Sequence, residues 1–229
     1  MDIETSDKII KKLENIYPVA ECELRYNGED WKLLIMAMLS AQCTDKRVNI
    51  VSAELFEKFP SVEALAEADI NEIFTCIKSC GLYNTKGKNI KAACNKIMTD
   101  YGGRVPQTRE ELLTLPGVGR KIANLILGDC FSQPSIVTDT HLMRISARLG
   151  YHNYTKDKPE KIERTLDGII PKEKQAEFCH RLVLFGRECC TAASPKCSIC
   201  PLADLCYTNI KNKTNEIPES SGAYRERQK

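Results

Sequence analysis

The stretch LPGVGRKIANLILG, residues 115–128, decides the fold. It places Pro-Gly-Val-Gly, residues 116–119, between a short helix expected over 108–115 and a longer apolar helix. Gly117 and Gly119 tolerate left-handed or otherwise strained dihedrals and carry no side chain, and Val118 between them can anchor the turn in the core. The stretch therefore predicts two helices joined by a tight turn.

The same turn predicts a binding site for an anion. Its glycines expose backbone N–H groups at the N-terminus of the second helix, where the helix dipole favours negative charge. A phosphate fits there, and the rival phosphate-binding motifs GxGxxG and GxxxxGKS do not occur in the sequence. Because turn residues between helices are common, the turn alone also fits a purely structural connection.

Two charged residues near the turn suggest catalysis. Lys121 lies in the first turn of the second helix, where a cation opposes the dipole, and Asp139 lies at an expected helix start in IVTDTH, residues 136–141. Each has a structural interpretation, Lys121 as a solvated lysine and Asp139 as an N-cap. The dipole, burial and neighbouring Arg120 are all expected to disfavour the charged form of Lys121. A neutral lysine facing a carboxylate is a workable catalytic pair.

The remainder of the chain indicates an all-α protein. Apolar residues recur at helical spacing, and no sustained alternation of period two predicts a sheet. About ten helices joined by short loops are expected. The first is expected to be capped by Thr5 or Ser6, and the polar segment from about Thr208 is expected to fray. Further helices are expected over 31–39, 45–59, 62–68, 70–80, 84–101, 139–149, 159–169 and 171–185.

Four of the twelve cysteines form a tight group with the spacing C-x6-C-x2-C-x5-C: Cys190, Cys197, Cys200 and Cys206. In a reducing compartment this spacing indicates a metal site and not disulfides. The alternative is that the four are unrelated cysteines buried in the core without a shared ligand. A tetrahedral zinc ion and an iron–sulfur cluster are both physically open, and either is expected to act as a structural clip. Cys189 is an ambiguous neighbour of the group. Arg187 and Lys196 are expected to screen the site and to reach phosphates.

Composition excludes some classes of protein. The chain has 229 residues and a net charge of only +2, so a nucleic-acid surface must come from local clustering of charge. The N-terminal segment lacks the apolar core of a secretory signal, and no apolar run nears the ~20 residues of a membrane-spanning helix. We therefore expect a cytoplasmic protein without a membrane partner.

Taken together, LPGVGRKIAN, VTDTH and the cysteine spacing closely resemble the endonuclease III family of bifunctional DNA glycosylases/AP lyases. The segments SAQCTD, CGLYNTKGKNI and LVLFGRECC, which begin at residues 40, 80 and 182, add to a resemblance that spans roughly 25–206. It implies an all-α, two-domain helix-hairpin-helix glycosylase fold. Residues 23–133 would form a six-helix barrel domain, 1–22 with 134–212 an iron–sulfur cluster domain, and 213–229 a flexible tail.

The resemblance also assigns roles to residues. It makes Lys121 the nucleophile, Asp139 the catalytic carboxylate, and the four cysteines of the group the ligands of a [4Fe-4S] cluster. Gln42 would fill the gap left by a flipped nucleotide, and Leu82 would wedge into the opposite strand. The implied DNA-contacting set is Gln42, Leu82, Gly117, Val118, Gly119, Arg120, His141, Arg187 and Lys196. Cys43 and Cys189 are small departures from the family pattern.

The implied activity is excision of oxidised pyrimidines from double-stranded DNA, followed by cleavage of the abasic site by β-elimination through a lysine Schiff base. The implied protein is a monomer that associates with a prokaryotic nucleoid. Three other readings are weaker: a monofunctional glycosylase, such as the adenine-mismatch enzyme, which lacks a lysine at the position of Lys121; a non-catalytic DNA-binding module with a zinc clip; and an electron-transfer protein.

Overall fold

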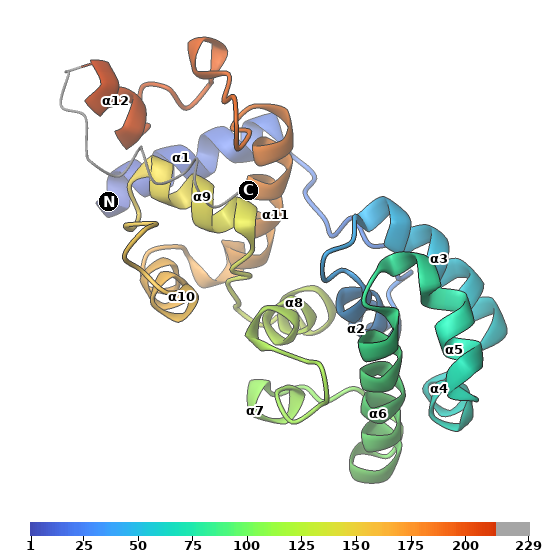
Figure 1. The fold of residues 1–229 in the computed structure, drawn as a ribbon. Helices are drawn as coiled ribbons and strands as arrows, with labels where there is room; N and C mark the ends of the chain where they lie inside the picture. Colours follow the sequence, from blue (N-terminus) through green and yellow to red (C-terminus); the bar gives the residue numbers. More distant parts are fainter. Residues whose placement is uncertain (214–229) are drawn as a thin grey trace. The chain divides into compact units, whose positions relative to one another are not determined.

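The computed structural model describes residues 1–213, which fold into helices and loops (Figure 1). These residues form twelve α-helices and three short 3-10 helices and contain no strand, so the all-α prediction is confirmed. The chain divides into two compact units, a central unit of Cys22–Gln133 and a terminal unit of Met1–Glu21 with the described residues from Pro134 onward. No helix within residues 1–213 is long and apolar enough to cross a membrane.

The central unit is built around α2, a helix buried on nearly all sides. Every residue from Leu33 to Leu39 is buried, as expected from the dense apolar run. The long helix α6 packs against α2, α4 and α5, and α8 packs against α2 and α7 (Figure 1). The elements of this unit are α2 (Asp30–Leu39), α3 (Asp45–Lys58), α4 (Val62–Glu67), α5 (Ile70–Ile77), η1 (Lys78–Cys80), α6 (Tyr83–Tyr101), α7 (Arg109–Leu112) and α8 (Arg120–Phe131).

Local capping explains where four of these helices begin. The side chains of Thr44, Ser61, Asp69 and Thr108 each accept a hydrogen bond from a backbone N–H in the first turn of α3, α4, α5 and α7. Such a cap satisfies a donor that the helix itself leaves unpaired and stabilises the helix by about 1 kcal/mol. The starts of α3, α4 and α5 are the ones expected from the sequence, whereas α7 is shorter than the helix expected over 108–115.

The terminal unit joins the first helix of the chain to the last ones. Helix α1 packs against α11, and α9 packs against α11 and α12 (Figure 1). Lys12 on α1 donates to the Pro201 carbonyl at 3.0 Å and pairs with Asp204 at 2.8 Å, so α1 also holds the cysteine-bearing segment. The elements are α1 (Ile3–Ile16), α9 (Thr140–Leu149), α10 (Pro159–Asp167), η2 (Lys172–Lys174), α11 (Gln175–Glu188), η3 (Cys197–Ile199) and α12 (Tyr207–Lys213).

Two local expectations are wrong. Asp2, and not Thr5 or Ser6, caps α1, because its carboxylate accepts from the N–H of Thr5 at 2.8 Å. Of the segment from Thr208 that is expected to fray, the described part belongs to α12, which runs to Lys213, and the Thr208 hydroxyl donates to the carbonyl of Arg148 at 3.0 Å. The helix expected over 171–185 begins as a 3-10 turn and extends to Glu188. Of the tail expected over 213–229, residues 214–229 lie outside the described residues.

Candidate functional site

The turn between α7 and α8 has the predicted form. Val118 is buried, and its N–H donates to the carbonyl of Leu115 at 3.1 Å. Gly117 has φ 79°, and a Cβ there would lie 2.8 Å from Cβ of Asn89 on α6. Glycine is therefore required at 117 by both backbone conformation and close packing. Gly119 differs from the expectation, because its φ of −102° is ordinary and no atom lies near its missing side chain.

Gly119 instead determines how α8 begins. It is the N-cap residue, and without a side chain it offers no acceptor to the first-turn N–H groups. The positive end of the helix dipole and the backbone donors of this turn therefore face outward without a side-chain cap. Arg120 is half-buried and Lys121 is exposed in this first turn. The expected burial of Lys121 is therefore not found.

Asp139 in the terminal unit begins α9 in the opposite way. Its Oδ1 accepts from the N–H of Leu142 at 2.7 Å, so the carboxylate is a true N-cap. The side chain is half-buried, while Thr138 before it is buried. The structural interpretation of Asp139 is thus correct, and it is compatible with a second role because the carboxylate keeps one oxygen outside this hydrogen bond.

Gln42 and Leu82 share an unusual backbone conformation. Only four non-glycine residues among 1–213 have a positive φ, and these two are among them, at 53° and 47°. Both side chains are exposed, Leu82 to 58%. A left-handed leucine at a helix start costs about 1–3 kcal/mol, so the surrounding structure must hold it there. Strain of this kind gathers at functional sites, and the two predicted DNA-inserting residues carry it.

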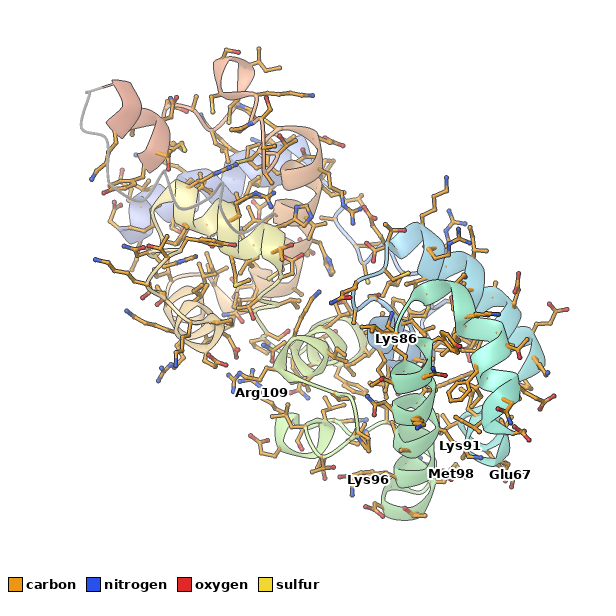
Figure 2. All side chains as sticks on the ribbon, in the orientation of Figure 1. Glu67, Lys86, Lys91, Lys96, Met98 and Arg109 are labelled. Atoms are coloured by element: carbon orange, nitrogen blue, oxygen red, sulfur yellow. The ribbon has the colours of Figure 1, made fainter. Side chains whose placement is uncertain are left out.

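A buried lysine holds the two segments that carry these residues. Lys86 on α6, labelled in Figure 2, is only 6% exposed. Its Nζ donates to the carbonyls of Leu39 at 2.8 Å and Cys80 at 2.7 Å. Leu39 ends α2 three residues before Gln42, and Cys80 ends η1 two residues before Leu82. Burial lowers the pKa of Lys86, and the two carbonyls accept hydrogen bonds from its amine. Lys86 therefore fixes the spacing of the segments within the central unit.

In the terminal unit, α9 and α11 approach closely beside His141. A Cβ at Gly186 would lie 2.5 Å from Nδ1 of His141, and that nitrogen lies 3.2 Å from the Arg144 guanidinium. His141 is half-buried, whereas Arg187 and Lys196 are exposed. Gly186 is therefore what allows α11 to pack onto the start of α9.

The four cysteines of the predicted ligand set gather around one cavity of about 570 Å³ in the terminal unit, and Cys189 lines it as well. The Arg148 guanidinium donates to Sγ of Cys190 at 3.2 Å and to the carbonyl of Thr191 at 2.8 Å. The thiol of Cys206 in turn donates to the carbonyl of Arg148 at 3.3 Å. One arginine thus contacts both the first and the last cysteine of the motif.

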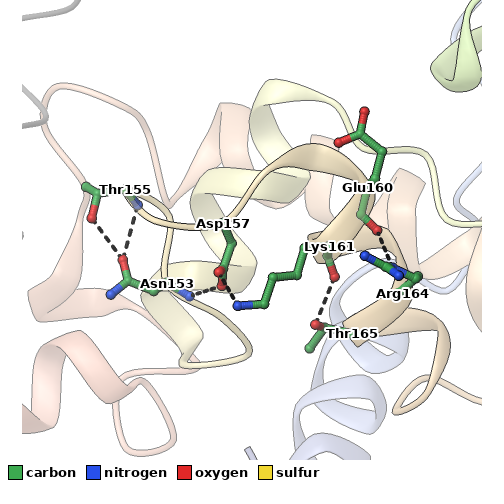
Figure 3. Close-up of polar contacts among 7 residues, drawn as sticks. All are labelled: Asn153, Thr155, Asp157, Glu160, Lys161, Arg164 and Thr165. Atoms are coloured by element: carbon green, nitrogen blue, oxygen red, sulfur yellow. Dashed lines mark hydrogen bonds and ion pairs between the residues drawn. The ribbon is translucent and has the colours of Figure 1, made fainter.

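The loop after α9 also lines this cavity, through Asn153 and Thr155. Figure 3 shows the polar contacts within this loop and with α10. Asp157 accepts from the backbone N–H of Asn153 at 3.0 Å and pairs with Lys161 on α10 at 2.6 Å. The Thr155 hydroxyl donates to the side-chain carbonyl of Asn153 at 2.9 Å. These short-range hydrogen bonds fold the loop onto itself and tie it to α10.

Comparison with known proteins decides the family. Residues 35–172 match the model of the HhH-GPD superfamily base excision DNA repair protein, and 190–206 match the iron-sulfur binding domain of endonuclease III. Endonuclease III of Bacillus subtilis (strain 168) is 42% identical over 92% of this chain and 95% of its own. The chain belongs to the endonuclease III family. Endonuclease III of Escherichia coli (strain K12) is 36% identical over 87% of this chain and 93% of its own.

Solved structures agree with this family. The structure described as a trapped endonuclease III–DNA covalent intermediate matches with a TM-score of 0.87 and 39% identity, covering 93% of this chain and 99% of that one. A thermostable thymine-DNA glycosylase matches with a TM-score of 0.83 at 23% identity, which supports the fold. The activity of this endonuclease III family member is that of a base-excision DNA glycosylase and AP lyase. The predicted helix-hairpin-helix glycosylase fold is confirmed.

The cofactor of this endonuclease III family member is a [4Fe-4S] cluster. The cavity fits such a group, because all four cysteines of the motif line it and the Arg148 guanidinium lies against the sulfur of Cys190, where it can offset the negative charge of thiolate ligands. Within residues 1–213, no three His, Cys, Asp or Glu side chains converge as the ligands of one metal ion do. The match to the iron-sulfur binding domain decides between the cluster and the tetrahedral zinc ion that the sequence left open.

Sequence reasoning missed Lys86 and Arg148. Both have a weak signal in the sequence: Lys86 shares a helical face with Ile90, Ala93 and Ile97, where an apolar residue is expected. Arg148 lies in the last turn of α9, next to the buried Leu149, where a cation is ordinary because it stabilises the C-terminal end of the helix dipole. Their partners lie far away in the sequence, so neither role can be read from local pattern.

Proposed function

We propose that this chain excises oxidised or ring-saturated pyrimidines from double-stranded DNA and then cleaves the abasic site by β-elimination through a Schiff base on Lys121. The observation that carries the proposal is the start of α8. There an uncapped helix terminus, an anion site by its chemistry, lies two residues from an exposed primary amine. A phosphate held at the terminus would bring its sugar within reach of that amine.

The reaction begins with extrusion of the damaged nucleotide, because the sugar carbon cannot be attacked inside the stacked duplex. Gln42 would fill the gap, and Leu82 would wedge into the opposite strand. Their exposure and their fixed, left-handed backbone suit insertion between bases. Unstacking costs a few kcal/mol, and it costs least for a lesion that already stacks badly, which contributes to selectivity.

The neutral Lys121 amine then attacks C1′ of the extruded nucleotide, and the damaged base leaves as C1′ forms its bond to nitrogen. The Asp139 carboxylate would stabilise the positive charge that develops on the sugar and accept or return protons. The C1′–O4′ bond of the sugar ring then breaks, with O4′ taking up a proton and the nitrogen losing one, which leaves a Schiff base between C1′ and Lys121. The Schiff base acidifies the neighbouring C2′ proton, and removal of that proton expels the 3′ phosphate. Hydrolysis of the imine returns the lysine.

We assign the domains as the resemblance implies. Residues 23–133 are the six-helix barrel domain, and 1–22 with 134–212 are the cluster domain. The cluster, held by Cys190, Cys197, Cys200 and Cys206, supplies a covalent clip for the loop that presents Lys196. The phosphate contacts are assigned to the α7–α8 turn through Gly117, Val118, Gly119 and Arg120, with Arg187, Lys196 and His141 from the cluster domain. The protein acts as a monomer, in the cytoplasm and on the nucleoid.

Borohydride trapping tests the central step. Holo-protein is mixed with duplex DNA that contains thymine glycol or an abasic site, and sodium borohydride reduces the imine to a stable covalent adduct. Wild type and the matched control Lys58→Gln, an exposed lysine at the end of α3, should both form the adduct. Lys121→Gln should form none. An adduct that survives Lys121→Gln overturns the assignment of the nucleophile.

The same experiment separates the rival activities. A monofunctional glycosylase releases the base but gives neither adduct nor strand cleavage, and a non-catalytic DNA-binding module releases no base. The presence of Lys121 argues against a monofunctional glycosylase, and membership of the endonuclease III family argues against a non-catalytic module.

A further inference from the structure

Lys86 binds the backbone where the two inserting segments begin, the segment just after α2 and the segment just after η1. Its Nζ donates to the carbonyl of Leu39, the last residue of α2, at 2.8 Å, and to that of Cys80, the last residue of η1, at 2.7 Å. Its backbone N–H donates to the carbonyl of Leu82 at 3.0 Å, the first hydrogen bond of α6. One residue of α6 thus holds both inserting segments.

Lysine is an unexpected residue at this position. Lys86 is only 6% exposed and shares a helical face with buried Ile90 and Ala93, where an apolar side chain would pack without an amine to desolvate. An apolar side chain would leave the carbonyls of Leu39 and Cys80, each at the end of a helix, without this donor. The two carbonyls therefore explain the lysine better than packing does.

Both inserting segments leave the bound carbonyls in a strained backbone conformation. Gln42 has φ 53°, three residues beyond Leu39, and Leu82 has φ 47°, two residues beyond Cys80. A left-handed conformation at a non-glycine residue persists only where the surrounding structure holds it. The conformations of both predicted DNA-inserting residues thus depend on backbone points that Lys86 fixes.

Helix α6 also supports the turn that is proposed to hold a phosphate. Asn89 lies three residues after Lys86, so the two side chains leave the same side of the helix. The side chain of Asn89 lies against Gly117, where a Cβ would come within 2.8 Å of it. Within the central unit, one side of α6 therefore contacts both inserting segments and the α7–α8 turn.

We propose that Lys86 is a positioning residue for extrusion of the damaged nucleotide, because it holds Gln42 and Leu82 at the separation that insertion into the duplex requires. This inference rests on the proposed function of those two residues, and Lys86 acts through them. Without the amine, the ends of α2 and η1 lose their common hydrogen-bond donor and can move independently. Displacement of about 1 Å at a positioning group can cost about 100-fold in rate.

The test compares two lysines of α6, which are both labelled in Figure 2. Lys86→Met removes the donors and keeps an apolar stem of similar length. The matched control is Lys91→Met, because Nζ of Lys91 donates to the carbonyl of Ala68, which belongs to neither inserting segment. Chemical unfolding and the visible absorbance of the cluster show that each variant is folded. If Lys86→Met does not fold, Lys86→Gln, whose side-chain nitrogen is one bond closer to the backbone, replaces it throughout.

The first measurement follows extrusion itself. Holo-protein is mixed rapidly with duplex DNA that carries thymine glycol beside 2-aminopurine, whose fluorescence rises when the neighbouring stack opens. Lys86→Met should slow this rise about 10–100-fold, whereas Lys91→Met should stay within about twofold of wild type. A wild-type rise in Lys86→Met overturns the proposal. Equal slowing in both variants also overturns it, because the loss then comes from a weakened α6.

The second measurement is a double-mutant cycle on single-turnover excision of thymine glycol. If Lys86 acts through Leu82, the slowing by Lys86→Met should shrink at least about threefold in a Leu82→Ala background, because the residue that it positions is already gone. Undiminished slowing in that background overturns the proposal, since independent losses add in free energy.

Wild-type protein separates the two possible failures. If wild type neither raises the fluorescence nor forms a borohydride adduct, the proposed function fails. If wild type does both and Lys86→Met keeps the wild-type rates, the positioning role of Lys86 is refuted while the proposed function stands.

Discussion

Helices α8 and α9 begin in opposite ways. Helix α9 starts at Asp139, whose carboxylate caps the N–H of Leu142, whereas α8 starts at Gly119, which has no side chain to offer. Helix α9 thus satisfies a backbone donor at its own N-terminus, whereas α8 leaves the donors at its N-terminus without a side-chain cap and open to an external anion. A helix start without a side-chain cap can therefore mark a binding site, because its free N–H groups can bind the negative charge of a ligand.

The largest expected effect is a loss of turnover in Asp139→Asn, a variant that keeps the helix cap at residue 139 but removes the charge proposed for catalysis. Asp139→Asn keeps an amide oxygen for the N–H of Leu142 but removes the charge, so folding and DNA binding should be retained. Turnover on thymine glycol DNA should fall about 10²–10⁴-fold, as for loss of a general acid–base group. Single-turnover kinetics measure this.

The matched control is Asp69→Asn, the same change at the cap of α5 in the central unit. It should leave turnover within about twofold, since an asparagine cap is nearly as good as an aspartate cap. If Asp139→Asn and wild type have equal turnover, Asp139 serves only as a helix cap and is not the catalytic carboxylate.

The second prediction concerns Gly119→Asp, which gives α8 an aspartate N-cap like that of α9. Gly119→Asp meets open space and an ordinary φ, so the side chain fits and can accept from the first-turn N–H groups. It fills the anion site and repels phosphate, so the Kd for DNA with a non-cleavable abasic analogue should rise about 10–100-fold. Gly119→Ala, which adds no acceptor, should bind much as wild type does. Tight binding by Gly119→Asp contradicts the anion site.

A third change tests the turn that precedes α8. Gly117→Ala must adopt φ 79° and place its methyl 2.8 Å from Cβ of Asn89, so it should lower the free energy of unfolding by about 2–3 kcal/mol. Chemical unfolding measures this. In an Asn89→Gly background, which removes that Cβ, part of the loss should remain, because the dihedral penalty does not depend on residue 89. No loss at all would mean that the turn relaxes freely.

The smallest effect concerns the cap of α9 alone. Asp139→Ala should be about 1 kcal/mol less stable than Asp139→Asn, because alanine leaves the N–H of Leu142 without its side-chain acceptor. The two variants should be equally slow in turnover if charge is what matters there. The midpoints of chemical unfolding of the two cluster-loaded proteins give the comparison, and identical midpoints contradict a stabilising cap.

Features that depend on neighbours in the sequence could be predicted. Helices α3, α4 and α5 begin where they were expected, at residues 45, 62 and 70, since a capping side chain and the N–H that donates to it lie within three residues of each other. Asp2 was missed because three candidate caps stand close together and the choice among them depends on where the helix first packs. The family of the chain followed from the joint order of its motifs.

Features that depend on distant partners could not be predicted. Lys86 reaches a carbonyl on α2 and Arg148 a thiol beyond α11, and no local pattern names such partners. The exposure of Lys121 was also misjudged, because helical spacing gives the face of a residue but not what covers that face. The roles of Lys121, Asp139, the four cysteines and the DNA-contacting residues remain predictions.

The contact between α1 and α11 also constrains how the protein is made. During synthesis α1 leaves the ribosome first, but its partners follow only after the entire Cys22–Gln133 unit has been translated. The central unit can fold while the chain grows, whereas the apolar face of α1, with Ile9, Ile10 and Leu13, must wait without cover. The terminal unit closes last, so assembly of the cluster loop, which Lys12 ties to α1, comes at the end of folding.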